Sequence, residues 1–280
     1  MPAKKSSKAS NLPGIGFLGA GKMATALAQG WLNAKLINPA KTFASDPYEK
    51  ARDHFTEVTS CKTLTDNQEL VNKCETVVLA VKPGDVHHVL ENLSRDFETK
   101  HLLISIAAGV SLTQLAELIG FDQRIIRVMP NTPCLVGASA SAYAVSLTAT
   151  DEDKTFIDKL LSAVGKAFAV PEKLLNAVTG LSGSGPAFVY LMIEALTDGG
   201  VRVGLPRDVA QALATQTVYG AARMVLETEQ HPVLLKDAVA SPGGTTMAGL
   251  HALEEGKFRS VVMSAVQAAT ERAEELGKIH

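Results

Sequence analysis

Residues 14–24 constrain the fold of this chain more than any other stretch. Residues 15–18 are apolar and predict a buried strand, and the pattern Gly19-x-Gly21-x-x-Ala24 follows directly, opening a helix over 24–32. This spacing is typical of a dinucleotide-binding turn, because Gly19 permits a sharp turn, Gly21 leaves room for a pyrophosphate and Ala24 lets the helix pack closely on the strand. The helix N-terminus favours an anion. We therefore predict a dinucleotide site here, with an ordinary structural turn as the alternative.

The composition limits the kinds of partner. With 280 residues, 46% of them hydrophobic, the chain can form one large domain or two ordinary ones. A net charge of −2 and a pI near 6.4 give no broad attraction for nucleic acid. No apolar run approaches the roughly 20 residues that span a bilayer. We expect neither a nucleic-acid nor a membrane partner.

The N-terminal residues and the cysteines indicate the compartment. Residues 1–13 form a basic, Ser-rich leader that we predict to be disordered; it lacks the apolar core of a secretion signal and the arginines of a transit peptide. Cys61, Cys74 and Cys134 are odd in number and show no CxxC spacing, which is typical of reduced thiols. We expect a cytoplasmic protein. His87 and His88 are adjacent on a predicted helix and point apart, so we expect no metal site.

Alternating apolar strands and helices fill the first half of the chain. This order predicts an α/β fold with a mostly parallel, doubly wound sheet of the Rossmann type over residues 14–171. We expect strands at 15–18, 41–45, 76–81, 102–106, 124–129 and 140–145, helices at 24–32, 85–93 and 112–119, and a closing segment at 159–169.

Residues 172–280 carry helical patterns only. We expect helices at 188–201, 207–227, 233–239, 245–253 and 258–276, many of them rich in Ala and apolar on more than one face. Such helices have more apolar surface than one small bundle can bury, so we predict a helical domain that associates into a dimer.

Polar and charged residues near the second predicted strand bear on the choice of cofactor. Ser45, with Lys50 and Arg52 beyond it, could hold the 2′-phosphate of NADP, whereas Asp46 would repel that phosphate if it pointed inward. The alternative is that residues 45–47 only cap the next helix.

A second glycine-rich turn, residues 241–246, precedes a predicted helix. Its successive backbone N–H groups form a cradle for an anion, and the hydroxyls of Thr245 and Thr246 add hydrogen-bond donors; a purely capping role is the alternative. The turn at 181–186 opens a long helix and is expected to be structural, with Pro186 in the first turn. Glu229 is either a solvated loop acid, which the sequence favours, or a group near a cationic substrate.

Seven blocks of sequence occur in a fixed order: residues 16–24, 80–83, 107–109, 131–133, 180–187, 198–200 with 204–206, and 241–246. In this order they resemble the pyrroline-5-carboxylate reductases. The resemblance covers nearly the whole chain after the leader, and its last two blocks are more specific than the glycine fingerprint, which many dehydrogenases share.

The resemblance implies a reaction and a set of binding residues. The family reduces the C=N bond of 1-pyrroline-5-carboxylate with NAD(P)H to give L-proline, which requires the two reacting carbons to be held about 3–3.5 Å apart. It implies substrate binding by Glu229, Ser241, Gly243, Gly244, Thr245 and Thr246. It implies cofactor binding by Gly19, Ala20, Gly21, Lys22, Met23, Ser45, Asn67, Val81, Lys82, Pro83, Ala107, Gly109 and Asn131.

The resemblance also implies roles for single residues and for the assembly. Thr246 is the expected catalytic hydroxyl, bonded to the ring nitrogen, although no residue is identified as a dedicated general acid. Ala238 stands where some members carry Asn, so a side-chain bond from that position is missing here. The expected cofactor is NADPH, with NADH also usable. The expected assembly is a homodimer through the helical domain, and the resemblance extends to a decamer of five dimers.

Two other functions fit parts of the sequence. A β-hydroxyacid dehydrogenase also joins a dinucleotide domain to a helical one, but it uses a lysine after its glycine turn, and no lysine occurs between Lys173 and Lys236. A dinucleotide-sensing regulator would not need the turn at 241–246, and the chain has no basic helix-turn-helix pattern to link sensing to DNA.

Overall fold

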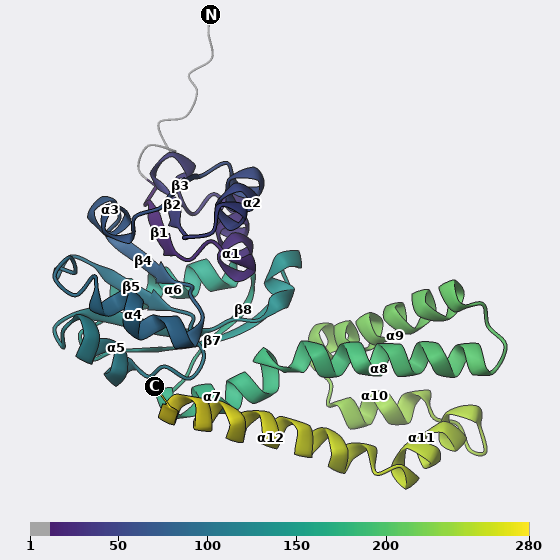
Figure 1. Ribbon diagram of the computed structural model, residues 1–280. Helices are drawn as coiled ribbons and strands as arrows, with labels where there is room; N and C mark the ends of the chain where they lie inside the picture. Colours follow the sequence, from purple (N-terminus) through teal and green to yellow (C-terminus); the bar gives the residue numbers. More distant parts are fainter. Residues whose placement is uncertain (1–11, 280) are drawn as a thin grey trace, which may run out of the picture. The chain divides into compact units, whose positions relative to one another are not determined.

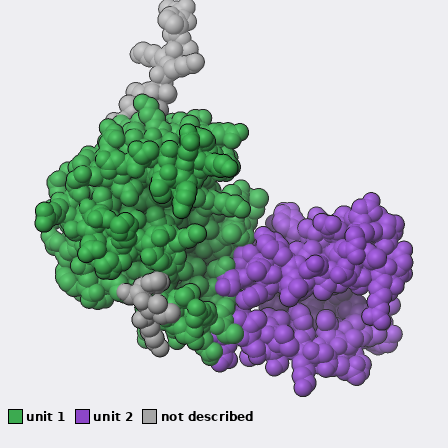
Figure 2. All heavy atoms as spheres, in the orientation of Figure 1, with its two compact units in different colours: residues 1–183, 268–280 green, residues 184–267 purple. Residues whose placement is uncertain are grey.

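The computed structural model describes residues 12–279, so the predicted leader lies outside the described residues except for its last two. The chain divides into two compact units (Figure 2). Unit 1 runs to Gly183 and resumes at Ala268, and unit 2 comprises Ser184–Gln267. This division falls later in the chain than residue 171, and it assigns the last part of the C-terminal helix to unit 1. None of the helices in the described part of the chain is long and apolar enough to cross a membrane.

Unit 1 is built on an eight-stranded sheet in the order β3-β2-β1-β4-β5-β6-β7-β8 (Figure 1). The strands from β3 to β6 are parallel; β7 runs antiparallel to β6, and β8 is parallel to β7. The predicted mostly parallel sheet is confirmed. The strands are β1 Ile15–Leu18, β2 Phe43–Ser45, β3 Lys62–Leu64, β4 Thr76–Leu79, β5 Leu102–Ser105, β6 Arg124–Met129, β7 Ser139–Val145 and β8 Gly165–Ala169.

Helices cover both faces of this sheet because its central strands are apolar on both sides. On one face, Trp31 and Ile157 pack with Val78 of β4, and on the other Leu90 and Leu115 pack with neighbouring residues of the same strands. The two faces alternate along each strand with a period of two. The helices of unit 1 are α1 Lys22–Asn33, α2 Glu49–Thr59, α3 Asn67–Lys73, α4 Val86–Glu91, α5 Leu112–Ile119, α6 Asp151–Ser162 and α7 Leu175–Val178.

Some elements differ from the sequence-based prediction. The segment at 159–169 is not one element: it contains the end of α6 and the strand β8. The polar stretch around Asn67 contains β3 and α3, which the sequence analysis did not predict. The start of α6 carried a local signal, since Thr150 and Asp153 form a capping box. β3 is only three residues long, and it becomes a strand by pairing with β2.

Unit 2 consists of helices, as predicted. α8 and α9 lie side by side and antiparallel (Figure 1), yet Tyr190, Leu213 and Tyr219 on them remain exposed. Such exposed apolar surface is typical of a domain that associates with a partner. The helices are α8 Gly185–Arg202, α9 Arg207–Thr228, α10 Pro232–Val239, α11 Thr245–Glu255 and α12 Phe258–Ile279, the last of which continues into unit 1 from Ala268.

A partly buried ion pair joins the sheet to the segment that follows it. The Arg127 guanidinium on β6 donates to Glu172 Oε1 at 3.2 Å and to Asn176 Oδ1 at 3.2 Å, and the Arg127 side chain is only 8% exposed. The same Glu172 oxygen accepts the backbone N–H of Leu112, at the start of α5, at 2.6 Å. One carboxylate therefore holds together β6, α5 and the segment before α7.

We expect Glu172→Ala to lower the free energy of unfolding of unit 1 by roughly 3 kcal/mol, because the buried Arg127 guanidinium loses its carboxylate and keeps only Asn176, and the Leu112 N–H loses its acceptor. Urea unfolding at one fixed protein concentration measures the change. The exposed Glu152→Ala on α6 is the control and should change the midpoint little. Equal midpoints for the two variants would show that the pair does not stabilise unit 1.

Candidate active site

The first glycine turn lies where β1 ends, between two neighbouring strands. Gly19 has φ +99°, and its N–H donates to the carbonyl of Ser45 at the end of β2 at 2.8 Å. A Cβ at this position would lie 2.8 Å from the carbonyl oxygen of Ala80, which follows β4. Only glycine fits both the positive φ and this close backbone approach. The sharp turn expected at Gly19 is confirmed.

The space in front of α1 fits a phosphate. A Cβ on Gly21 would meet no heavy atom of the described residues within 4 Å. Gly21 is also the N-cap of α1, and within the described chain no side chain caps that helix. The N–H groups of Lys22 and Met23 have no partner inside the helix because they belong to its first turn. Uncapped donors beside open space suit a pyrophosphate group.

Asp46 closes one side of this turn. Its Oδ2 accepts the N–H of Ala20 at 2.9 Å, and its Oδ1 accepts the N–H of Tyr48 at 2.9 Å. The N-cap of α2 is Tyr48, which makes no side-chain cap bond within residues 12–279. Asp46 is therefore more than a helix cap: its carboxylate points toward the glycine turn. The Arg52 guanidinium donates to the Asp46 carbonyl at 2.6 Å, so a cation lies close by.

Ser45 and Asn67, both expected at the adenosine end, lie next to each other. The Ser45 hydroxyl is buried, with the residue 1% exposed, and donates to Asn67 Oδ1 at 2.6 Å. Asn67 is half-buried at the first turn of α3. This bond engages the Ser45 hydroxyl, whereas Lys50 on α2 is exposed. Cations of α2 are thus more accessible to a 2′-phosphate than Ser45.

The remaining cofactor residues predicted from the sequence follow the parallel strands at the same sheet edge. Residues 81–83 follow β4 and residues 107–109 follow β5. Asn131 follows β6 and is 6% exposed. Its Oδ1 accepts the Ser139 hydroxyl and the Ala140 N–H, both at 3.0 Å, and its Nδ2 donates to the Ser182 carbonyl at 3.0 Å. The Asn131 side chain therefore holds the backbone around the site.

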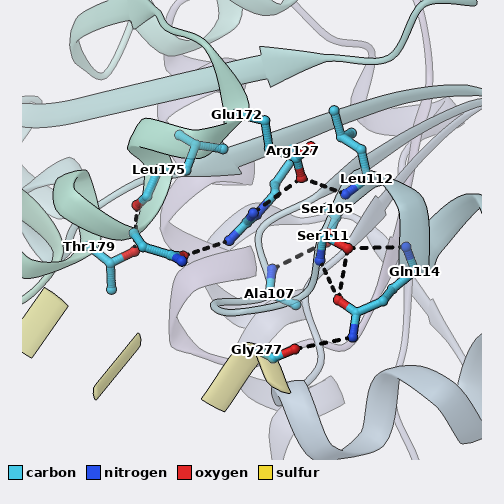
Figure 3. Close-up of polar contacts among 11 residues, drawn as sticks. Ser105, Ala107, Ser111, Leu112, Gln114, Arg127, Glu172, Leu175, Thr179 and Gly277 are labelled. Atoms are coloured by element: carbon cyan, nitrogen blue, oxygen red, sulfur yellow. Dashed lines mark hydrogen bonds and ion pairs between the residues drawn. The ribbon is translucent and has the colours of Figure 1, made fainter. Parts of the chain in front are cut away.

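A set of contacts around residues 105–114 was missed by the sequence analysis (Figure 3). Ser111 and Gln114 form a capping box at the start of α5, and Gln114 Nε2 donates to the carbonyl of Gly277 in α12 at 3.3 Å. The Ser-x-x-Gln pattern before an apolar run was a usable signal for the capping box. No local signal indicates the contact with Gly277, which is distant in the sequence.

The second glycine turn lies in unit 2 between α10 and α11. Gly243 has φ +68°, and the Gly244 N–H donates to the Ser241 carbonyl at 3.0 Å. A Cβ on Gly244 would overlap the Ser241 hydroxyl, so a larger residue there would force the Ser241 side chain to move. Gly244 is the N-cap of α11, and the described residues provide no side-chain cap. The first N–H groups of α11, from Thr245 on, are therefore available to an anion.

The predicted substrate residues are not all brought together within one chain. Thr246 is half-buried and Thr245 exposed at the start of α11, next to Ser241. Glu229 ends α9 with φ 54°, and α10 separates it from Ser241. An eight-residue helix is about 12 Å long, so Glu229 and the turn lie at opposite ends of α10. Ala238 is exposed near the end of that helix.

A metal site was not expected. Among residues 12–279, no group of three or more His, Cys, Asp and Glu side chains could hold a metal ion.

Two family models match the chain. Residues 172–276 match the model described as pyrroline-5-carboxylate reductase dimerisation, and residues 14–109 match the model described as NADP oxidoreductase coenzyme F420-dependent. Unit 2 lies within the first match, and the first glycine turn lies within the second.

Similar proteins are found in distant organisms. The pyrroline-5-carboxylate reductase of Glycine max is 48% identical over 263 residues, which cover 94% of this chain and 95% of that protein. The enzyme of the same name from Methanosarcina acetivorans is 47% identical over 264 residues, which cover 94% of this chain and 98% of that protein. A crystal structure of Plasmodium falciparum pyrroline carboxylate reductase with NADP bound matches with a TM-score of 0.87 at 38% identity, over 95% of this chain and 98% of that one.

The three cysteines are buried, free thiols, which makes them poor nucleophiles. Burial raises the pKa of Cys74 to about 11, although the neighbouring Lys73 acts in the opposite direction. Burial also raises the pKa values of Cys61 and Cys134. Since the thiolate is the reactive form, these thiols stay protonated and unreactive at neutral pH.

We expect the native protein to react slowly with Ellman's reagent at pH 8, because all three thiols are buried and their pKa values lie above this pH. The reaction should still be slow at pH 9. The same protein in urea serves as the control and should release three equivalents at once. A fast native reaction of one or more thiols at pH 8 would contradict this prediction.

Proposed function

The chain belongs to the pyrroline-5-carboxylate reductase family, and we propose how its two glycine turns bind the partners of that reaction. It is an NAD(P)H-dependent oxidoreductase that reduces the C=N bond of 1-pyrroline-5-carboxylate to give L-proline. The β-hydroxyacid dehydrogenase and regulatory alternatives do not account for this family membership. The roles of individual residues below are the proposal.

We assign substrate binding to the uncapped start of α11. The substrate is a small carboxylate, and residues 241–246 present backbone N–H groups at a helix N-terminus, where the dipole favours a negative charge. Gly243, Gly244, Thr245 and Thr246 would hold the carboxylate, with Ser241 beside them. The available donors are those from Thr245 on, because the Gly244 N–H bonds the Ser241 carbonyl. The positive φ at Gly243 favours glycine there, so the turn is built into the backbone before α11. Glu229, at the far end of α10, would contribute through the second subunit of a dimer.

The first glycine turn would bind NADPH. Open space at Gly21 and the free N–H groups of Lys22 and Met23 suit the pyrophosphate, and the edge formed by residues 81–83, 107–109 and 131 would border the nicotinamide half. Ser45 and Asn67 would lie at the adenosine ribose. When bound, NADPH supplies the hydride for the imine carbon. We propose NADPH as the preferred cofactor, with NADH also used.

Thr246 is proposed as the catalytic hydroxyl. Its place in the first turn of α11, half-buried beside the carboxylate cradle, suits a hydroxyl that hydrogen-bonds the ring nitrogen and orients the imine. The hydroxyl oxygen accepts the N–H of a protonated imine, and the hydroxyl donates to an unprotonated one. An alcohol is a weak acid, so the proton reaches the nitrogen from a protonated substrate or from water. Positioning is then the main contribution of the protein.

We also propose a homodimer formed through unit 2, and a decamer of five such dimers as the larger assembly. The exposed apolar residues of α8 and α9 and the matched dimerisation model support the dimer. Three buried free cysteines suit a reducing compartment, and we propose the cytoplasm.

The reaction is tested by the loss of NADPH absorbance, and separately of NADH absorbance, when the purified protein meets 1-pyrroline-5-carboxylate, with proline identified as product. We expect oxidation of both, faster with NADPH. Binding of the dinucleotide without oxidation would contradict the proposed substrate.

We expect Thr246→Ala to lower kcat about 10- to 100-fold, the effect of losing one hydrogen bond to a charged group, worth about 1.5–3 kcal/mol. The affinity for NADPH, measured by fluorescence titration, should stay unchanged. Thr246→Ser keeps the hydroxyl and should retain most of the turnover. If Thr246→Ala turned over at the wild-type rate, Thr246 would have no role in the reaction.

We expect Asp46→Asn to raise the ratio of kcat/KM for NADPH to that for NADH about 5-fold, which corresponds to roughly 1 kcal/mol of removed repulsion of the 2′-phosphate. Both cofactors should bind somewhat less well, because Asn cannot accept both N–H groups that Asp46 now accepts. Asp53→Asn, exposed on α2, is the control. An unchanged ratio would show that Asp46 does not face the 2′ position.

A further inference from the structure

The turn after β5 touches the C-terminal end of α12 through two glycines. Gly109 has φ +81°, and a Cβ on Gly277 would lie 2.7 Å from the Gly109 carbonyl oxygen. In the other direction, a Cβ on Gly109 would lie 3.3 Å from the Gly277 nitrogen. The two backbones are therefore in direct contact. A side chain on Gly277 would collide with the Gly109 carbonyl, and one on Gly109 would be tight and strained by the positive φ.

Gln114 ties this contact to α5 (Figure 3). Its Oε1 accepts the Ser111 N–H at 2.8 Å and the Ser111 hydroxyl at 2.9 Å, and its Nε2 donates to the Gly277 carbonyl at 3.3 Å. The last carbonyls of a helix have no partner inside it, and Gly277 is in the last turn of α12. The amide of Gln114 thus provides a hydrogen-bond partner both for the Ser111 N–H, at the start of α5, and for the Gly277 carbonyl, at the end of α12.

Further bonds leave the turn little freedom. The Ala107 N–H donates to the Ser105 hydroxyl at 3.3 Å, and Ser105 is fully buried. The Leu112 N–H donates to Glu172, which the buried Arg127 holds in place. Residues 107–112 are therefore held in place by contacts with the sheet, with the segment before α7 and with the end of α12.

We propose that Gln114 is a positioning residue for hydride transfer. Its side chain links Ser111 to the Gly277 carbonyl, which keeps the end of α12 in contact with Gly109 and holds the turn at 107–109 in one position. The proposal rests on the proposed function, in which this turn borders the nicotinamide. Gln114 itself does not touch the reactants. A displacement of the turn by a fraction of an ångström would misalign the reacting carbons, and such misplacement is costly to the rate.

Two substitutions test the link from its two sides. Gln114→Glu keeps an acceptor for the Ser111 N–H but places a carboxylate oxygen against the Gly277 carbonyl. Gly277→Ala favours a helix in general, yet here its Cβ meets the Gly109 carbonyl. The matched controls are Glu117→Gln on α5 and Glu274→Ala on α12, both exposed positions.

For both test variants we expect kcat to fall about 10-fold, while the dissociation constant for NADPH changes less than about 3-fold. The primary isotope effect on kcat with NADPH deuterated at C4 should increase, because hydride transfer becomes slower than the other steps. The controls should match wild type in all three measurements. The proposal would be overturned if both test variants had the wild-type kcat and the wild-type isotope effect. It would also be overturned if kcat and the affinity for NADPH fell in parallel while the isotope effect stayed unchanged.

Hydrogen–deuterium exchange separates this proposal from the proposed function. Residues 107–112 should exchange at least about 10-fold faster in both test variants than in the controls, whether or not the wild-type protein reduces the imine. Unchanged exchange in this segment would overturn the link even in an active enzyme. If wild type were inactive while exchange rose as expected, the assigned reaction would fail, and with it the role in hydride transfer.

Discussion

Unit 1 depends on the close approach of three parallel strands at Gly19. The Gly19 N–H bonds the carbonyl that ends β2, and the absence of a side chain allows the carbonyl after β4 to come within contact of its Cα. Because β1 is the central member of this group, the turn it enters is aligned with the ends of its neighbours. The uncapped start of α1 and the carboxylate of Asp46 then face the same turn. One backbone geometry therefore brings together the groups to which we assign dinucleotide binding.

The second glycine turn, in unit 2, likewise leads into a helix whose N-terminus has no side-chain cap among the described residues. Gly243, with its positive φ, lets the chain reverse before α11. In each case the protein leaves helix donors unsatisfied and thereby makes them available to an anion. The phosphate and the substrate carboxylate would be recognised by backbone groups, which leaves side chains such as Thr246 for orienting the reacting bond.

The residues that hold the site are different from those that would touch the ligands. Arg127 and Glu172 are partly or fully buried, and they connect β6 to the start of α5. Asn131 was expected near the nicotinamide, and its side chain bonds three backbone or side-chain groups around it. Gln114 joins α5 to the end of α12. These contacts restrict the turns that follow β5 and β6, which accounts for polar residues buried beside an otherwise apolar sheet.

The sequence by itself determined the elements whose signals are local. The glycine turn at 19–24, the helix Leu112–Ile119, the strand Arg124–Met129 and the helical second half were predicted from periodicity and turn residues, and the order of specific blocks indicated the family. The short strand β3 was missed because it is three residues long and becomes a strand only by pairing with β2. The helix α6 was merged with β8 although its capping box was a local signal. Only the tertiary structure decided that Asp46 reaches Ala20 and that Gly277 lies against Gly109. Such contacts join residues far apart in the chain, and no local pattern specifies which backbone segments approach closely once the strands are paired.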